Sequence, residues 1–352
     1  MQQTRKRKKV YTRPLDFKNG LVEMVHGSGG RAMTQLIDNL FVTAFDNPLL
    51  RQMNDQASFM GYSGRMVMST DSHVITPLFF PGGDIGSLSV NGTVNDVVMS
   101  GAKPCYLAAS FILEEGFPLA DLKKIVESMA AAARAIPIPI VTGDTKVVEQ
   151  GSGDGVFITT TGIGTVPEGV NISSERAKPG DKILLSGTVG DHGIAIMLIR
   201  EDMSFQSTLE SDTASLHSLV ASMVKIAPDI HVLRDPTRGG IAASLNEIAQ
   251  QSGTGMILYE NQIPMQTQVS AACEFLGFDP LYIANEGKLI AICSAEDADK
   301  LLAVMQAHPL GQNAAIIGEV IEDNHSFVQM ETRFGGRRVV DWLSGDQLPR
   351  IC

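Results

Sequence analysis

The feature that most constrains the fold is an alternation of strand-like and helix-like segments, which runs in two series separated by a turn-rich stretch. In the first series, apolar residues recur at three- and four-residue steps after Pro118, which predicts an amphipathic helix that ends before Pro137. A second helix is expected over 86–101. Runs of β-branched and apolar residues predict strands over 66–70 (ending at Asp71), 105–113, 138–142 (running into Gly143-Asp144) and 156–166.

Residues 167–181 collect Pro, Gly and Asp and lose the apolar periodicity, so they mark the expected domain boundary. In the second series we expect strands over 182–187, 255–260, 288–293 and 314–320, and helices over 191–200, 212–226, 239–251, 266–276 and 296–306. A chain of 352 residues, 44% of them apolar, can bury cores for two domains. The pattern therefore predicts two α+β domains of similar size.

Charge and cysteine content limit the class of protein. The net charge of -11 argues against a nucleic-acid surface on the folded body. The block Arg5-Lys6-Arg7-Lys8-Lys9 repels itself, so we expect residues 1–20 to form a basic flexible extension, with an anion contact as the alternative. The chain has no apolar run of about 18 residues and no signal-peptide pattern, so we expect a cytoplasmic protein without a membrane span. Its four cysteines include no C-x-x-C pair, which disfavours zinc and disulfide frameworks.

A glycine-rich segment, His26-Gly27-Ser28-Gly29-Gly30, precedes a plausible helix that starts at Arg31. Glycines let a backbone approach a phosphate closely, and a helix N-terminus favours anions, but such loops are more often plain turns. The chain has neither a G-x-x-x-x-G-K-[ST] loop nor a G-x-G-x-x-G turn after a strand. A nucleotide would therefore need a different kind of phosphate-binding site.

Four aspartates near the ends of predicted elements could bind the phosphates through a metal ion: Asp71, Asp96, Asp144 and Asp235. Magnesium prefers a few carboxylates together with substrate phosphates, and Lys146 and Arg238 could neutralise those phosphates. Each aspartate alone is more simply read as a helix cap or turn former. Only the set points to an ATP site.

Two further polar segments remain ambiguous. Glu286, in Asn285-Glu286-Gly287-Lys288, could act as a general base if an apolar neighbourhood raises its pKa, yet this composition is also typical of a solvent loop. His192 could contact phosphate or act as an acid or base, although a cap at a helix start is the simpler interpretation.

The chain ends in Pro349-Arg350-Ile351-Cys352, which places a thiol on the last residue. Terminal residues are usually frayed, so a nucleophile there can travel into an active site. Extended residues 345–352 would span about 26–29 Å at 3.3–3.6 Å each. We expect a mobile tail with an inward and an outward state.

Taken in order, these motifs resemble the HypE family of hydrogenase-maturation carbamoyl dehydratases, within the superfamily of aminoimidazole ribonucleotide synthetases and selenophosphate synthetases. The resemblance runs from residue 21 to the end and rests on His26–Gly30, Thr70–Ser72, Phe79–Gly83, Asn95-Asp96, Gly143–Lys146, Asp235–Gly240, Asn285–Lys288 and Pro349–Cys352.

The resemblance implies a two-domain α+β fold of the aminoimidazole ribonucleotide synthetase type. Residues 21–168 would form an ATP-binding domain that pairs across a homodimer, 169–340 an α/β domain, and 341–352 the mobile tail. The implied reaction is ATP- and Mg²⁺-dependent dehydration of a carbamoyl group on Cys352, from thiocarboxamide to thiocyanate, which supplies cyanide to the iron of [NiFe]-hydrogenase. The implied partners are the carbamoyltransferase HypF and the HypC–HypD scaffold complex.

Residue roles follow from the same resemblance. Cys352 would carry the substrate, Glu286 would remove an N–H proton, and Lys146 would stabilise charge on the phosphoryl or carbamoyl oxygen. ATP and metal would be bound by Gly27, Ser28, Gly29, Gly30, Asp71, Asp96, Asp144, Lys146, Asp235 and Arg238, with the four aspartates as the metal ligands.

Two other functions remain open at this point. Another ATP-dependent enzyme of the superfamily, such as a selenophosphate synthetase or a small-molecule kinase, would use related Asp and Gly motifs but would leave the terminal thiol unexplained. A non-enzymatic carrier would keep Cys352 for loading by a partner while the aspartates served as caps and turns.

Overall fold

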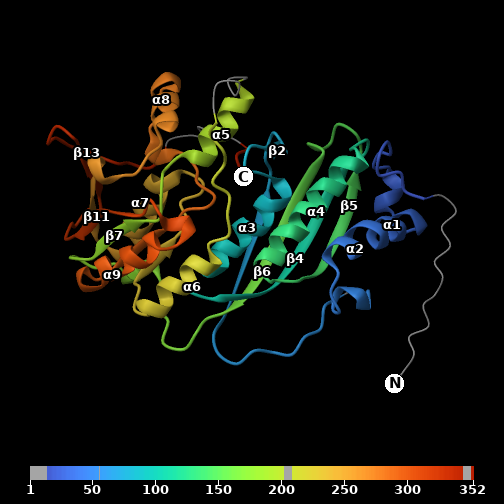
Figure 1. The fold of residues 1–352 in the computed structure, drawn as a ribbon, viewed down its shortest axis with the longest axis horizontal. Helices are drawn as coiled ribbons and strands as arrows, with labels where there is room; N and C mark the ends of the chain where they lie inside the picture. Colours follow the sequence, from blue (N-terminus) through green and yellow to red (C-terminus); the bar gives the residue numbers. More distant parts are fainter. Residues whose placement is uncertain (1–13, 55, 202–207, 344–349) are drawn as a thin grey trace.

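The computed structural model describes residues 14–54, 56–201, 208–343 and 350–352. They form two domains side by side, with the C-terminal residue at their junction (Figure 1). The basic block Arg5–Lys9 and most of the predicted tail, residues 344–349, lie outside the described residues.

The first domain is built on a four-stranded sheet with the strand order β1-β6-β4-β5. Only the β4–β5 pair is parallel; β1–β6 and β4–β6 are antiparallel. The strands are β1 (Met66–His73), β4 (Lys103–Glu114), β5 (Ile140–Val148) and β6 (Val156–Thr165), and β2 (Phe79–Phe80) with β3 (Gly83–Asp84) forms a separate hairpin. The helices are α1 (Arg31–Leu36), α2 (Val42–Phe45), α3 (Ile85–Val98) and α4 (Leu119–Ala135).

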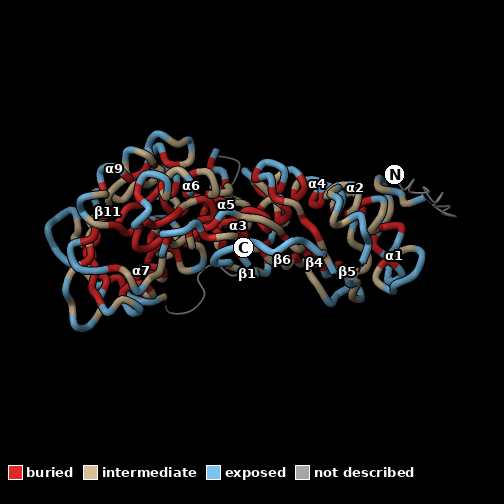
Figure 2. Tube along the Cα trace, turned by 90° about the horizontal axis from the view of Figure 1, so that it is seen from below, coloured by how far each residue is buried: buried red, intermediate tan, exposed pale blue. Residues whose placement is uncertain are grey.

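The two faces of this sheet differ. Side chains alternate along β4 and β6, and the buried set packs on the side where α3 and α4 lie. The other face, which we call the open face, carries partly or fully exposed side chains, including Met66, Met68 and Ile112. Seen along its edge, the sheet has its helices on one side (Figure 2).

The second domain contains a seven-stranded sheet with the order β13-β12-β9-β11-β7-β10-β8. Its strands are β7 (Lys182–Leu185), β8 (Val232–Arg234), β9 (Gly255–Tyr259), β10 (Ile290–Cys293), β11 (Ala315–Ile321), β12 (Val328–Glu331) and β13 (Arg337–Val339). Its helices are α5 (Asp191–Arg200), α6 (His217–Ile226), α7 (Gly240–Ser252), α8 (Thr267–Leu276) and α9 (Ala295–Gln306). No helix of the described residues is long and apolar enough to span a bilayer.

Three predictions about local structure are wrong, each for a physical reason. Strand β1 continues past Asp71 because its antiparallel pairing with β6 extends to His73. Strand β5 likewise continues through Gly143, which is required because a Cβ there would lie 2.0 Å from the Ala109 carbonyl oxygen. Helix α6 begins at His217 instead of 212 because residues 212–216 bond to other elements.

The inner boundary of the predicted N-terminal extension also needs correction. Residues 14–20 join the first domain, since Leu15 and Phe17 pack against its core and the Leu119 N–H donates to the Gly20 carbonyl oxygen at 2.9 Å. One hydrophobic cluster runs from this domain into the second, and it includes Ile351 of the tail. The domains therefore share a core, and the tail belongs to it.

Candidate active site

Three aspartates and one glutamate converge where the two domains meet: Asp71, Asp96, Asp235 and Glu286. Asp71 points to the helix side of the sheet, because its row continues through the buried Thr160 and Ala109. Asp96 lies on α3 and accepts a hydrogen bond from Ser69 Oγ at 2.7 Å. We call these four residues the acidic cluster.

Burial and repulsion between neighbouring carboxylates raise the pKa of three groups in the acidic cluster. Burial, then the charge of Asp96, raises the pKa of Asp235 to about 7. Burial also raises the pKa of Asp96, and the charge of Asp71 adds to that effect. The pKa of Glu286 is raised well above its usual value by burial first and then by neighbouring aspartates, and its Oε1 has no hydrogen-bond partner. The carboxyl groups of Asp96, Asp235 and Glu286 therefore favour a proton or a cation.

The backbone of Glu286 is fixed from both domains. Asn95 of α3 donates through Nδ2 to the Glu286 carbonyl oxygen at 3.1 Å. The Glu286 N–H donates to Asp212 Oδ1 at 3.0 Å, and Lys288 Nζ holds the other oxygen of Asp212 at 3.0 Å. Gly287 permits this packing, since a Cβ there would lie 1.8 Å from the Asp212 carbonyl oxygen. The segment that composition could not tell from a solvent loop is thus a buried, ordered element.

The chain end docks beside the continuation of β1. The Val74 N–H donates to the Cys352 carbonyl oxygen at 2.9 Å, and Ile351 forms a β-bridge with Ile75. Ile351 is only 5% exposed, and Cys352 is half-buried against the core. Arg350 pairs with Asp154 at 2.6 Å. Residues 350–352 therefore occupy an inward position, docked on Val74 and Ile75, which follow Asp71 along the chain.

Asp144 and Lys146 lie elsewhere. In the sheet register Asp144 aligns with Ser110 and Lys146 with Ile112, which puts both on the open face, opposite to the face that Asp71 uses. Lys146 Nζ contacts Asp144 Oδ2 at 3.1 Å, and both side chains are more than half exposed. Three strand steps of about 4.8 Å also put β5 roughly 14 Å from β1. One chain does not bring all four predicted metal aspartates together.

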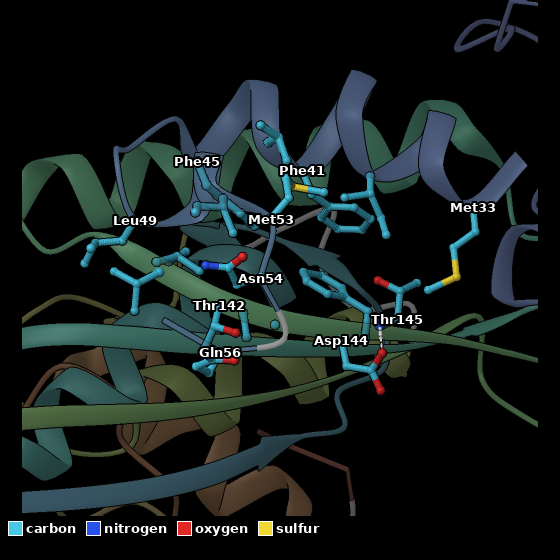
Figure 3. A pocket seen from close by; sticks show the side chains of 18 residues that line it. Met33, Phe41, Phe45, Leu49, Met53, Asn54, Gln56, Thr142, Asp144 and Thr145 are labelled. Carbon is cyan, nitrogen blue, oxygen red and sulfur yellow. Dashed lines mark hydrogen bonds between the residues drawn. The ribbon is translucent and has the colours of Figure 1, made fainter. Parts of the chain in front are cut away.

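A cavity of about 390 Å³ opens at the β5 edge (Figure 3). Apolar side chains such as Phe41, Phe45 and Leu49 form one wall, and the opposite side carries Asn54, Gln56, Thr142 and Asp144. Its size and lining are those of a small-molecule site: mostly apolar with a few polar groups. The sequence did not point to this cavity, because residues far apart along the chain, such as Phe41, Leu49 and Thr142, line it together.

The glycine-rich segment lies next to this edge. Gly27 packs so closely on β5 that a Cβ would lie 2.6 Å from the Val147 nitrogen. Ser28, Gly29 and Gly30 are largely exposed, and Met33 of the following helix lines the cavity. We call Asp144, Lys146, this cavity and residues 27–30 the β5-edge group.

Two arginines, Arg234 and Arg238, lie near the acidic cluster. Arg238 is exposed, and its charge lowers the pKa of Asp96 and of His73. Arg234, which the sequence reading missed, acts on Asp96 and Asp235 in the same direction. Asp212, Lys288 and Asn95 as supports of Glu286 were missed too, because only tertiary contacts reveal them.

The donor set fits a magnesium ion that arrives with a nucleotide better than one held by protein alone. In the described part of the chain, no three His, Cys, Asp or Glu side chains are close enough to hold a metal ion. Magnesium commonly uses one or two carboxylates plus phosphate oxygens, and a cation would relieve the repulsion within the acidic cluster.

Comparisons with known proteins agree with this architecture. The family model "AIR synthase related protein, N-terminal domain" matches residues 54–166, and "AIR synthase related protein, C-terminal domain" matches residues 178–331. Carbamoyl dehydratase HypE of Cupriavidus necator is 68% identical over 343 residues, which cover 97% of this chain and 98% of that protein.

Two solved structures extend the likeness to three dimensions. A crystal structure of hydrogenase maturation protein HypE in complex with ATP matches with a TM-score of 0.91 at 50% identity, covering 94% of this chain and 99% of that one. A HypE–HypF complex matches with a TM-score of 0.78 at 50% identity, covering 88% and 99%. The chain therefore belongs to the HypE carbamoyl dehydratase family, within the AIR synthase related proteins.

Proposed function

We propose that this protein dehydrates a carbamoyl group carried on the Cys352 thiol, converting a thiocarboxamide to a thiocyanate that supplies cyanide to the iron of [NiFe]-hydrogenase. Membership of the family makes the chain an ATP-dependent carbamoyl dehydratase of hydrogenase maturation. The observation that supports Cys352 as the carrier of the carbamoyl group is the inward docking of residues 350–352 beside β1, the strand that contains Asp71.

The chemistry requires a better leaving group and a base. ATP supplies a phosphoryl group to the carbamoyl oxygen, so that phosphate rather than hydroxide leaves as the C–O bond breaks. Both N–H protons are lost, and the products are S–C≡N on Cys352, ADP and phosphate. Glu286 fits the role of base: its Oε1 is buried and has no hydrogen-bond partner, and its raised pKa makes its carboxylate a stronger base than that of an ordinary glutamate.

Charge stabilisation is assigned to the acidic cluster and the β5-edge group together. Asp71, Asp96 and Asp235 would bind Mg²⁺ ions that arrive on the phosphates, one or two carboxylates to each ion, with Arg238 beside them, and Lys146 would stabilise the developing oxygen charge. Asp144 would reach the same nucleotide from β5. The cavity at the β5 edge is proposed to take the nucleobase, and residues 27–30 to approach the phosphates.

These two groups can act on one nucleotide only if a second chain brings them together. We propose a homodimer in which the open faces of two sheets pair, burying Met66, Met68 and Ile112. A twofold axis along the strands reverses the strand order of the partner sheet, so that β5 of one chain faces β1 of the other. The partner's β5-edge group would then complete the acidic cluster.

Two partners follow from the family. We propose that HypF loads the carbamoyl group onto Cys352, since a HypE–HypF complex is among the matching structures. A HypC–HypD complex is proposed as the acceptor. Both steps require the thiol to leave the inward position.

The decisive experiment follows the intact mass of carbamoylated protein. Adding ATP is expected to remove one water from the carbamoylated chain, and Cys352→Ala should not be carbamoylated at all. Cys105→Ser, at the other half-buried cysteine, is the matched control and should behave like the wild type. Carbamoylation without ATP-dependent water loss would support the carrier alternative instead.

A further inference from the structure

One buried imidazole holds the carbonyl group next to the carrier cysteine. His192 Nε2 lies 2.7 Å from the Ile351 carbonyl oxygen, and Nδ1 lies 2.7 Å from Ser211 Oγ. The His192 side chain is fully buried, and the ring meets Phe80 edge-on at 5.7 Å between centroids. A helix cap, the simpler interpretation from sequence, does not describe this residue.

The hydrogen bonds fix the protonation of the ring. A carbonyl oxygen can only accept, so His192 Nε2 carries a proton and donates it to Ile351. Burial lowers the pKa of His192, so the ring is neutral and Nδ1 accepts from the Ser211 hydroxyl. The imidazole thus has one donor for the tail and one acceptor for its own support.

Helix α5 holds the tail at two points. His192 lies in its first turn and Arg200 at its last residue, and positions eight apart lie on one face of a helix. Arg200 donates to the carbonyl oxygens of Thr76 and Arg350. His192 and Arg200 both donate to backbone carbonyl oxygens of the tail. Modification of the Cys352 thiol does not change these carbonyl groups, so the same contacts can form in the thiol, carbamoylated and cyanated forms.

We propose that His192 is a positioning residue that latches the carrier tail in the position where dehydration occurs. This inference rests on the proposed function for the reaction that the latch serves. Its support, Ser211, adjoins Asp212, whose carboxylate accepts from the Glu286 N–H. The latch and the proposed base are therefore fixed by neighbouring residues of one segment.

The test compares His192→Phe, which keeps a buried ring but removes both polar contacts, with His192→Gln, which can donate and accept again. In a Cys105→Ser background, the rate of Cys352 alkylation by a maleimide is expected to rise about five- to tenfold in His192→Phe, the effect of losing one net hydrogen bond. Single-turnover dehydration of the carbamoylated protein should slow by a similar factor, while carbamoyl loading by HypF is not slowed.

Two controls separate the latch from a general loss of stability. His231→Phe removes another buried histidine, bonded to Asp181 away from the tail, and should leave Cys352 alkylation unchanged. Ser211→Ala is a milder change that should raise alkylation by a smaller factor, and it tests the proposal should His192→Phe fail to fold. Recovery of both rates in His192→Gln is expected.

The outcomes distinguish the latch from the function it serves. If His192→Phe, or Ser211→Ala in its place, alkylates and dehydrates at the wild-type rate, the latch is refuted. If alkylation rises as expected but the wild type shows no ATP-dependent water loss, the latch stands and the dehydratase proposal fails.

Discussion

The acidic cluster and the β5-edge group belong to one proposed site, yet they are built in opposite ways. The cluster lies where both domains of one chain meet, and burial, followed by its like charges, raises the pKa of Asp96, Asp235 and Glu286. Asp144 and Lys146 lie exposed on the open face of the same sheet. Carboxyl groups that repel one another favour a bound cation, and an exposed ion pair beside a cavity is typical of a surface that a ligand or a second chain can cover.

The sharpest test of the buried region is Glu286→Gln. Removing a general base should slow dehydration about 10²- to 10⁴-fold. ATP binding should persist because the Glu286 N–H and carbonyl contacts are backbone contacts. Water loss by mass spectrometry and ATP titration by calorimetry measure the two effects, and Glu322→Gln, an exposed site in the second domain, is the control. Normal turnover in Glu286→Gln would remove this residue as the base.

The exposed region is tested by Lys146→Ala. Loss of one group that stabilises developing charge should cost about 10²- to 10³-fold in rate. If each site combines two chains, mixing this inactive variant with inactive Glu286→Gln should restore about one quarter of wild-type activity after random exchange of subunits.

The mixture has an internal control. Lys103→Ala, at another exposed lysine of the same sheet, should remain active alone. Absence of any recovery in mixed dimers, with exchange verified, would mean that each chain builds its site by itself.

The open face itself is tested by Met68→Glu. Met68 is 72% exposed, and burying an unpaired charge in an interface should weaken dimerisation on the order of tenfold or more. Sedimentation measures the association, and Phe275→Glu, at a 78% exposed site on α8, is the matched control. A dimer of unchanged affinity would place the interface elsewhere.

The smallest expected effect is on stability. The folded pKa of Asp235 is about 7 against 3.8 for an ordinary aspartate, so the folded chain binds a proton that the unfolded chain releases. The free energy of unfolding therefore falls as pH rises from about 4 to about 7. Asp235→Asn should raise it by about 1–3 kcal/mol above pH 7 in nucleotide-free protein, since one pKa unit is worth 1.36 kcal/mol.

Thermal melts at pH 5 and pH 8 measure this difference. Asp299→Asn, an exposed site on α9, should leave the pH dependence unchanged. Magnesium with ATP should stabilise the wild type more at pH 8, where the carboxylates are ionised, and Asp235→Asn should lose part of that gain. If magnesium with ATP stabilised the wild type and Asp235→Asn equally at both pH values, Asp235 would not be a ligand of the cation.

The sequence by itself determined the two-domain α+β fold, most of its helices and strands, and the types of residue that carry the proposed chemistry. Helical periodicity and turn residues act over a few positions, so a pattern reading can recover them. Strands β8, β12 and β13 were not predicted, since three or four residues carry too little pattern and are fixed by their neighbours in the sheet.

Only the tertiary structure decided which site residues meet. Whether Asp71 and Asp144 share a face depends on strand register, and a shift of one residue reverses every side chain. The role of His192 likewise depends on a contact with Ile351, 159 positions away along the chain. Local sequence specifies elements, whereas long-range packing decides which of their side chains form a site.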